Sequence, residues 1–451
     1  MNRSRLFRSA AVVLLIVATL TNFLPGSRPV TAATTGEVIA EARLLANTAV
    51  ETRCPDVVSP PGVDSLDIRA VAQHWQLASA DPGYESRYDL DSGGRIDIVD
   101  VMLAAAQWNT QGQPPMVEFT LVPPMGSTAD LLGRVGCVAV AGHRIAVYIN
   151  ALEGWWTKPT FANPTVPIAA DGTWSADITT GPGDPDATRI AAFVVPDAYV
   201  PPPMSGGYEL PPELYSFPHV LVNRARTIQF SGSTWEVKAS TFGVAGPGPN
   251  YFSYDESDVF IDAQGRLHLR ISYHDGRWWS TEVINADPLA YGTYTFTLAS
   301  RVDQLDPWPV VGLFTWDTGA PQVAYREIDI EHSRWGQPAN DNAQFVIQPW
   351  DTPGHMHRFD VQLQSDVSTH RFEWLPGEVR FASYRGYASP PAPGDLIEAW
   401  TYTGSDVPPV GGGHLRINFW LSEGHPPAEP QEVIVESVNF APVHVEESSH
   451  P

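Results

Sequence analysis

Three carboxylates in the short segment 327–331 are the residues of this sequence best suited to chemistry. Glu327, Asp329 and Glu331 alternate with Ile328 and Ile330. Because a β-strand points successive side chains to opposite faces, this pattern predicts three acids on one face and two buried isoleucines on the other. Like charges so close together resist ionising at the same time. The cluster suits a reaction that needs one protonated and one ionised carboxyl group, as glycoside hydrolysis does.

The surrounding segment, residues 225–442, is expected to form the β-sheets that position these acids. It carries ten of the 15 tryptophans. Segments 266–273, 292–298 and 414–420 alternate apolar and polar residues at period two, and no stretch shows sustained helical periodicity. Many strands without intervening helices predict a large antiparallel sandwich or jelly roll.

The acidic segment resembles the E-x-D-x-E signature of family 16 glycoside hydrolases, which have a concanavalin A-like jelly roll. Further motifs occur in the order that this family shows, so the resemblance covers nearly all of 250–440; they lie at 282–283, 291–292, 313–316, 344–345, 370–374 and 417–420. The resemblance implies that Glu327 is the nucleophile and Glu331 the general acid and then the base. It also implies that the charge of Asp329 helps to keep Glu331 protonated.

The same resemblance implies a set of sugar-binding residues, since aromatic rings stack on pyranose faces while amides and carboxylates fix hydroxyl groups. These residues are Trp316, Tyr325, Trp420, Glu282, Gln344 and Asn418. Strand parity places Tyr325 on the acidic face, and for each aromatic residue the alternative is plain core packing. Arg326, Ile284 and Val346 depart from residues that are frequent in relatives, which leaves the identity of the sugar open.

A second acidic cluster, in segment 89–100, follows the spacing of an EF-hand calcium loop. The oxygen ligands expected at loop positions one, three, seven, nine and twelve are Asp89, Asp91, the carbonyl of Arg95, Asp97 and Asp100. A copy 33 residues earlier aligns its acids with these but lacks other ligands. Paired loops with aspartate at position twelve resemble dockerin modules. This implies Ca²⁺ in the second loop and, more remotely, a cohesin-like protein partner.

Residues 1–33 are expected to be a secretory signal peptide. Three arginines precede the apolar run 10–20, and small residues at 30–32 offer a cleavage site. A membrane anchor is the alternative, but the run is shorter than the roughly 20 residues that span a bilayer. The formal charge of −24 disfavours nucleic acid and anionic membranes as partners. We therefore expect a secreted protein, in which Cys54 and Cys137 have the opportunity to pair.

The chain as a whole is expected to be mainly β, with several domains. The predicted order is a signal peptide (1–33), a small α-helical dockerin-like module (34–112), an immunoglobulin-like β-sandwich (113–224), the jelly roll (225–442) and a tail (443–451). The sandwich is predicted from period-two alternation in 138–149 and turn signals such as Asp171-Gly172. Proline-rich segment 196–218 reads as a covering loop or linker.

These observations favour a secreted retaining endo-glycosidase. It would hydrolyse O-glycosidic bonds of a β-linked polysaccharide, most simply a β-glucan, by double displacement and without a catalytic cofactor. One alternative is a lectin-like protein that binds sugar without turnover, although binding alone needs no three acids in register. Another is a transglycosylase that uses the same intermediate.

Overall fold

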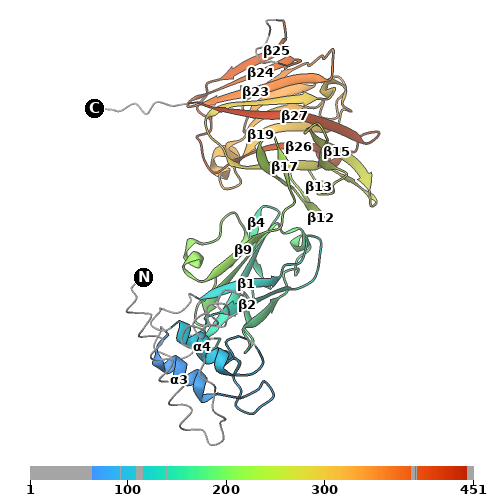
Figure 1. Ribbon diagram of the computed structural model, residues 1–451. Coiled ribbons are helices and arrows are strands. Elements are labelled where there is room, and N and C mark those ends of the chain that lie inside the picture. The colour runs from blue at the N-terminus through green and yellow to red at the C-terminus, as the bar shows by residue number, and fades with distance from the viewer. Residues whose placement is uncertain are drawn as a thin grey trace, which may run out of the picture.

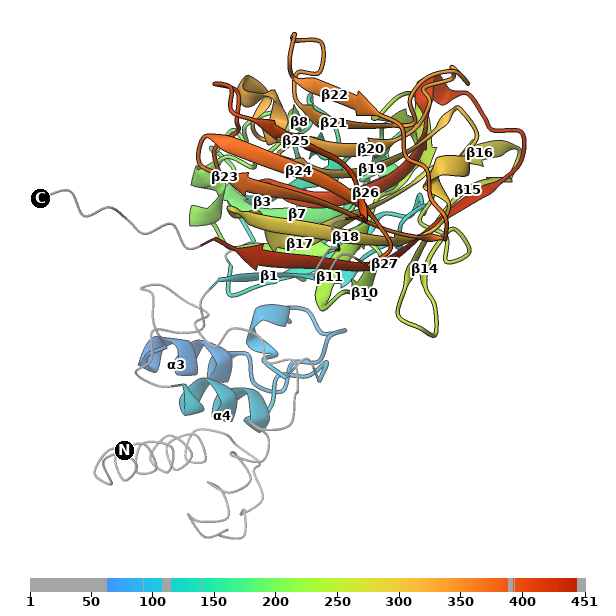
Figure 2. The ribbon, with the colours of Figure 1, turned by 90° about the horizontal axis from the view of Figure 1, so that it is seen from above.

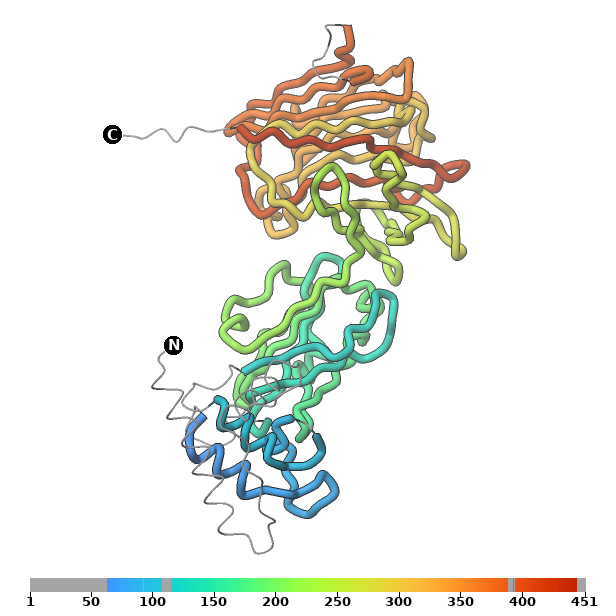
Figure 3. Tube along the Cα trace, in the orientation of Figure 1, coloured from blue at the N-terminus to red at the C-terminus, as the bar shows by residue number. Residues whose placement is uncertain are grey.

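The computed structural model describes residues 63–91, 93–107, 115–138, 140–387, 392 and 394–443. The expected signal peptide and the start of the first copy of the expected repeat, up to residue 62, lie outside these residues. The described elements form three units, each around its own hydrophobic core, which follow one another along the molecule (Figures 1 and 3). The fold is mainly β, as predicted. Within the described ranges, no helix combines the length and apolarity needed to cross a membrane.

The first unit contains two short helices that repeat one geometry. Helices α3 (Ser65–Gln73) and α4 (Ile98–Ala106) lie side by side, with the short η1 (Ser86–Tyr88) between them in sequence (Figure 2). Asp64 caps α3 and Asp97 caps α4, and each makes a reciprocal capping box with an aspartate three residues later. The 33-residue offset read from the sequence is therefore present in the structure.

The second unit is a sandwich of two antiparallel sheets. One sheet has the order β1 (Met116–Leu121), β2 (Leu131–Gly136), β6 (Thr173–Ala176). The other has the order β8 (Ser205–Gly207), β4 (Gly154–Lys158), β3 (His143–Ala151), β7 (Arg189–Pro196), β9 (His219–Asn223), with β5 (Thr165–Pro167) paired to β3. A core of aliphatic residues and Trp174 fills the space between them. Cys137 is disulfide-bonded, and Cys54, the only other cysteine of the sequence, lies outside the described residues.

The proline-rich segment covers the outer face of the larger sheet of this sandwich. It carries the short helix η3 (Pro212–Ser216), and η2 (Asp184–Asp186) precedes β7. Leu210 and Leu214 pack with Tyr148 and Phe193 in a second small core. The segment is thus a covering loop, one of the two roles expected from its composition.

The third unit is a jelly roll of two large antiparallel sheets, as predicted. One sheet has the order β10 (Thr227–Phe230), β11 (Ser233–Val237), β17 (Thr281–Pro288), β26 (His414–Leu421), β19 (Pro309–Trp316), β20 (Ile328–His332), β21 (Ala343–Ile347), β22 (Met356–Phe359). The other has the order β14 (Val259–Ile261), β15 (Leu267–His274), β27 (Gln431–Pro442), β18 (Gly292–Ala299), β23 (Val367–Leu375), β24 (Glu378–Arg385), β25 (Leu396–Tyr402), with β16 (Arg277–Trp279) paired to β15. Smaller elements are β12 (Ser240–Ala245), β13 (Asn250–Phe252), η4 (Val302–Gln304), η5 (Pro321–Arg326) and η6 (Ser422–Gly424).

One large core lies between these two sheets, and the acidic strand turns its isoleucines toward it. Ile328 and Ile330 are fully buried in this core together with Phe345 and Phe372. Period-two alternation then carries the acids of β20 to the opposite face of the sheet, away from the core. The hydrophobic pattern therefore fixes which face bears the chemistry.

Candidate active site

Four of the predicted site residues lie in one row across the sheet, on neighbouring strands. Glu282 pairs with Asn418, Asn418 with Gly312, Gly312 with Glu331, and Glu331 with Gln344. A Cβ atom on Gly312 would lie 2.4 Å from Oδ1 of Asn418. Glycine at this point therefore leaves room for the amide beside the acid. Sequence analysis missed this residue, although a glycine inside a strand signals a close approach.

Amide side chains hold two of the three acids. Nε2 of Gln344 donates to Oε2 of Glu331 over 2.6 Å, and Nε of Arg358 donates to Oε1 of Gln344 over 2.9 Å. Nε2 of Gln348 donates to Oδ2 of Asp329 over 3.1 Å. Asp329 and Glu327 also share a side-chain hydrogen bond. Glu331 is thus fixed from one side of the strand, while Asp329 and Glu327 act as a pair.

The pKa values of all three acids are raised, mainly because burial disfavours the charged form. The pKa of Glu327 rises to about 8 through burial and the neighbouring charge of Glu331. The pKa of Glu331 is also raised by burial, although the hydrogen bond from Gln344 opposes the change. Asp329 lies between the two, and after burial their charges raise its pKa well above the usual range. Burial and the two neighbouring charges thus favour the protonated form of Asp329, whereas the family resemblance implies a charge at this position.

Two aromatic rings form a platform beside the acids. The rings of Trp316 and Tyr325 stack 4.3 Å apart at an interplanar angle of 7°. Tyr325 reaches this position from a turn, because Ala324, Tyr325 and Arg326 all have left-handed backbone angles. Our strand-parity argument for Tyr325 was therefore wrong, although the residue does lie at the site.

The same turn shifts the start of the acidic strand. Strand β20 begins at Ile328, and Glu327 is the extended residue just before it. Oγ1 of Thr315 donates to the carbonyl of Arg326 over 2.7 Å and accepts from N–H of Ile328 over 2.9 Å. This hydroxyl joins the turn to strand β19. Glu327 is therefore positioned partly by the turn and partly by the sheet.

The site residues surround one cavity of about 670 Å³. Its walls include eight of the nine residues predicted for catalysis and sugar binding: Glu327, Asp329, Glu331, Trp316, Tyr325, Glu282, Asn418 and Trp420. Gln344 is not in this wall but contacts it through Glu331. A cavity with acids, amides and aromatic rings has the composition of a sugar-binding site.

Two cations at one end of the cavity were missed from the sequence. NH1 of Arg416 donates to Oε1 of Glu282 over 3.0 Å, and Nζ of Lys238 donates to Oε2 of the same carboxylate over 3.0 Å. Glu282 has no solvent-exposed side-chain surface, so its carboxyl oxygens contact these two side chains rather than solvent. Arg416 faces the cavity because it is two residues from Asn418 on strand β26.

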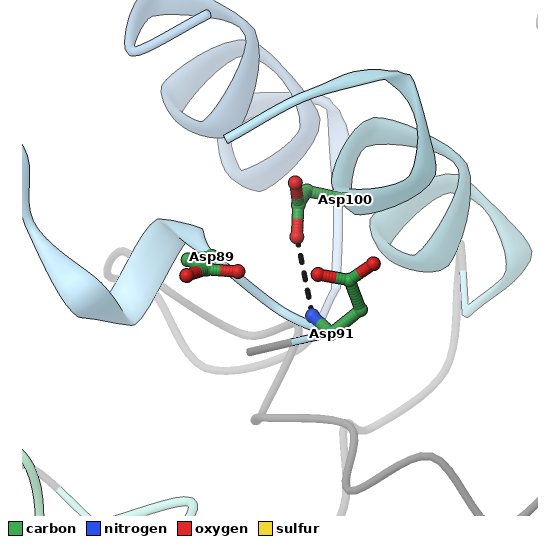
Figure 4. A group of neighbouring side chains, drawn as sticks. All are labelled: Asp89, Asp91 and Asp100. Atoms are coloured by element: carbon green, nitrogen blue, oxygen red, sulfur yellow. Dashed lines mark hydrogen bonds between the residues drawn. The ribbon is translucent and has the colours of Figure 1, made fainter. Parts of the chain in front are cut away.

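The acidic loop of the first unit brings three of its five predicted ligands together. Asp89, Asp91 and Asp100 each offer an oxygen within 4.8 Å of the others (Figure 4). Backbone N–H groups of Gly93 and Gly94 donate to Asp89 over 3.0 and 2.9 Å, which orients its carboxylate. The side chain of Asp97 instead caps helix α4 by accepting from N–H of Val99. Arg95 forms a β-bridge with Ala78.

No known protein family matches the sequence, and no curated protein matches it. Several solved structures are similar. A Bacillus licheniformis β-glucanase has 16% identity, covers 47% of this chain and 94% of its own, and gives a TM-score of 0.35. A β-1,3-1,4-glucanase (lichenase) derived from a mouse hindgut metagenome has 17% sequence identity. The match covers 48% of this chain and 96% of that one, with a TM-score of 0.35. An immunostimulatory antigen and pseudo β-1,3-glucanase of Mycobacterium tuberculosis has 20% sequence identity. The match covers 47% of this chain and 91% of that one, with a TM-score of 0.35. At these values the function of this chain has to be argued from its own residues.

Proposed function

We propose that this protein is a retaining glycoside hydrolase that cleaves a β-linked polysaccharide. The observation that carries the proposal is the cavity in which Glu327, Asp329 and Glu331 face an aromatic platform. Three neighbouring acids with raised pKa values, of which Asp329 is buried and Glu327 and Glu331 are half-buried, are costly for the folded state, and a site that only binds sugar has no need of them. Paired carboxyl groups in opposite protonation states are what glycoside hydrolysis requires.

The first chemical step divides the work between the two glutamates. Asp329 keeps its proton and donates a hydrogen bond to Glu327, which leaves Glu327 as the carboxylate of the pair. Glu327 attacks the anomeric carbon, and Glu331 gives its proton to the departing glycosidic oxygen. The product of this step is a covalent glycosyl-enzyme.

The second step returns the enzyme to its starting state. Glu331, now ionised, takes a proton from water, and the hydroxide attacks the anomeric carbon and displaces Glu327. Two displacements at the same carbon retain its configuration. The bond from Gln344 helps here, because an amide donor stabilises the charged form of Glu331 between the steps.

The preferred substrate class is a neutral β-glucan. The cations of the cavity, Arg416 and Lys238, already pair with Glu282, so the site offers no free cation for an acidic sugar at this point. Asn418 and the rings of Trp316 and Tyr325 remain for hydroxyl groups and sugar faces. The resemblance of the acidic strand to glucan-cleaving enzymes supports the same choice.

The test is the variant Glu327→Ala on a panel of barley β-glucan, laminarin, xyloglucan and agar. We expect wild-type protein to cleave at least one β-glucan, and the variant to lose roughly 10⁴-fold or more in rate. Azide should then enter the space left by the carboxylate and give a glycosyl azide of inverted configuration. Wild-type activity in the variant would refute the assignment. No turnover by the wild-type protein on any β-glycan would favour a binding protein instead.

We also propose that the protein is exported and that the acidic loop binds Ca²⁺. The export proposal rests on the pattern of residues 1–33. The calcium proposal rests on the convergence of Asp89, Asp91 and Asp100, since carboxylate oxygens are the preferred ligands of this ion. The cohesin-like partner implied by the dockerin resemblance stays a prediction.

A further inference from the structure

The second unit sends one hairpin into the candidate active site. Strands β3 and β4 are joined by the two residues Leu152 and Glu153, and both residues are part of the cavity wall. Glu153 accepts hydrogen bonds from both terminal nitrogens of Arg416, over 2.8 and 2.9 Å. It also accepts from Oγ1 of Thr318 over 2.9 Å and lies 3.5 Å from Nζ of Lys238. A residue of the second unit therefore forms part of the cavity wall, beside Arg416 and Lys238.

The electrostatics of this contact favour a fixed position for Glu153. Burial alone would raise its pKa, but the charges of Arg416 and Lys238 outweigh burial and lower it. Glu153 and Glu282 thus contact the same two cations. Bidentate contact of a carboxylate with an arginine is both strong and directional.

The hairpin turn adopts an unfavourable backbone to make this contact. Leu152 and Glu153 both have left-handed angles, with φ of 53° and 65°. Turns of this type favour Asn-Gly or Asp-Gly, because a residue with a Cβ atom is disfavoured at a left-handed position. For comparison, three two-residue hairpin turns of the third unit each contain a glycine: Ser231-Gly232, Asp275-Gly276 and Pro376-Gly377. A functional role for the side chains of Leu152 and Glu153 would explain why neither turn position is glycine.

Two further contacts hold the second unit against the jelly roll. Asp186, which is 1% exposed, accepts hydrogen bonds from N–H of Thr241 and Phe242 over 2.6 and 2.8 Å. Arg189 makes a bidentate contact with Glu236 over 2.9 and 3.0 Å. Together with the contact between Glu153 and Arg416, they fix the second unit to the jelly roll at three positions. The position of Glu153 therefore does not rest on a single ion pair.

We propose that the tip formed by Leu152 and Glu153 is the end wall of the sugar cleft. The wall lies at Arg416, which is two strands from Asp329 through Phe314, or roughly 10 Å. This distance leaves room for about two pyranose rings between the acids and the wall. The polysaccharide must then enter the cleft by one of its chain ends. The released products are short, and their lengths fall within a narrow range. This proposal rests on the proposed hydrolase activity, and it replaces internal cleavage, the mode expected from the sequence.

The test replaces the tip with the residues that its turn prefers. The double variant Leu152→Asn, Glu153→Gly keeps the hairpin backbone, removes the side chain of Glu153 and replaces that of Leu152 by a smaller one. On barley β-glucan, we expect wild-type protein to release products of about two sugars with a slow fall in viscosity. The double variant should release products at least twice as long, with a faster fall in viscosity for each bond cleaved.

Two single variants serve as controls. One tests whether the shape of the tip or its charge sets the product length, and the other tests whether any change in a hairpin turn has the same effect. Glu153→Gln keeps the shape of the tip and should keep the short products. Asp275→Asn lies in the β15–β16 turn outside the cavity and should match wild-type protein in product length and rate. Unchanged product lengths in the double variant, or long mixed products from the wild-type protein, would overturn the proposal. If the wild-type protein cleaves no glycan, the proposed function itself fails, and that outcome is distinct from unchanged product lengths.

Discussion

The acidic loop at 89–100 and the acidic strand at 327–331 each gather three carboxyl groups, but different donors surround them. In the loop, backbone N–H groups of Gly93, Gly94 and Leu90 donate to the carboxylates of Asp89 and Asp100. In the strand, the donors are side-chain amides and the acids themselves. A turn exposes N–H groups that a paired strand has already used in its ladder.

This difference separates two uses of acid clusters. Backbone donors keep the carboxylates of the loop oriented toward a shared point, as a cation site requires. Burial raises the pKa of acids in both clusters, that of Asp100 to about 6, but in the loop backbone N–H donors to Asp91 and Asp100 oppose the change. In the part of the chain that the structure describes, the three acids at 327–331 accept from side chains and not from backbone N–H groups, so burial and mutual repulsion meet less opposition there. Protons held on a buried acid are available for transfer in a reaction. The same residue types therefore suit a metal in one place and proton chemistry in the other.

Of the three changes that test this comparison, Glu331→Gln has the largest expected effect. Loss of the general acid should lower polysaccharide hydrolysis by about 10²- to 10⁴-fold. The variant keeps an oxygen that accepts from Gln344, so the site keeps its shape. An aryl glycoside with a good leaving group needs no protonation, and its first step should be affected much less. Equal losses on both substrates, measured by the initial burst of phenol, would contradict the acid role of Glu331.

Calcium binding gives the next prediction. We expect titration of the full chain to show one dominant Ca²⁺ site and a stabilisation of about 2.7 kcal/mol at an ion concentration 100 times the Kd. Asp89→Asn should abolish most of this gain, as measured by thermal unfolding with and without Ca²⁺. Asp64→Asn serves as the control. Asp64 caps α3 in the first copy, as Asp97 caps α4 in the second, and its replacement should leave the Ca²⁺ affinity unchanged. Two sites of equal strength would contradict our interpretation of the first copy.

The smallest effect concerns stability as a function of pH. Because the pKa of Asp329 is raised in the folded state, the folded protein holds a proton that the unfolded chain loses above about pH 4. Stability from this group is therefore present at low pH and is lost as pH rises toward the folded-state pKa. Asp329→Asn keeps a donor to Glu327 without titrating. Between pH 5 and pH 8 it should therefore lose less stability than wild-type protein, measured by urea unfolding. Equal pH dependence of the two proteins would count against the protonated Asp329.

Much of the fold and the site follows from short-range pattern. The alternation of 327–331 predicts which face of the strand bears the acids, and Ile328 and Ile330 are indeed in the core. The repeat offset aligns Asp64 with Asp97, and in the structure both residues cap a helix, a role that the sequence analysis did not predict. Tyr325 shows the limit of this reasoning, because three left-handed residues interrupt the strand where parity assumed that it continues. The backbone there is set by contacts with Thr315 and Asp317 on the neighbouring segment.

The sequence by itself determined the residue types and spacing of both acidic clusters, the strand period and the order of the units, since these depend on neighbours along the chain. Only the tertiary structure decided that Glu282, Asn418, Gly312, Glu331 and Gln344 share one row. It also decided that Glu153 meets Arg416, a residue 263 positions away. Contacts of this kind depend on strand order, on sheet register and on the docking of one unit against another. A sequence pattern read locally carries none of these, so the wall of the cleft is visible only in the folded chain.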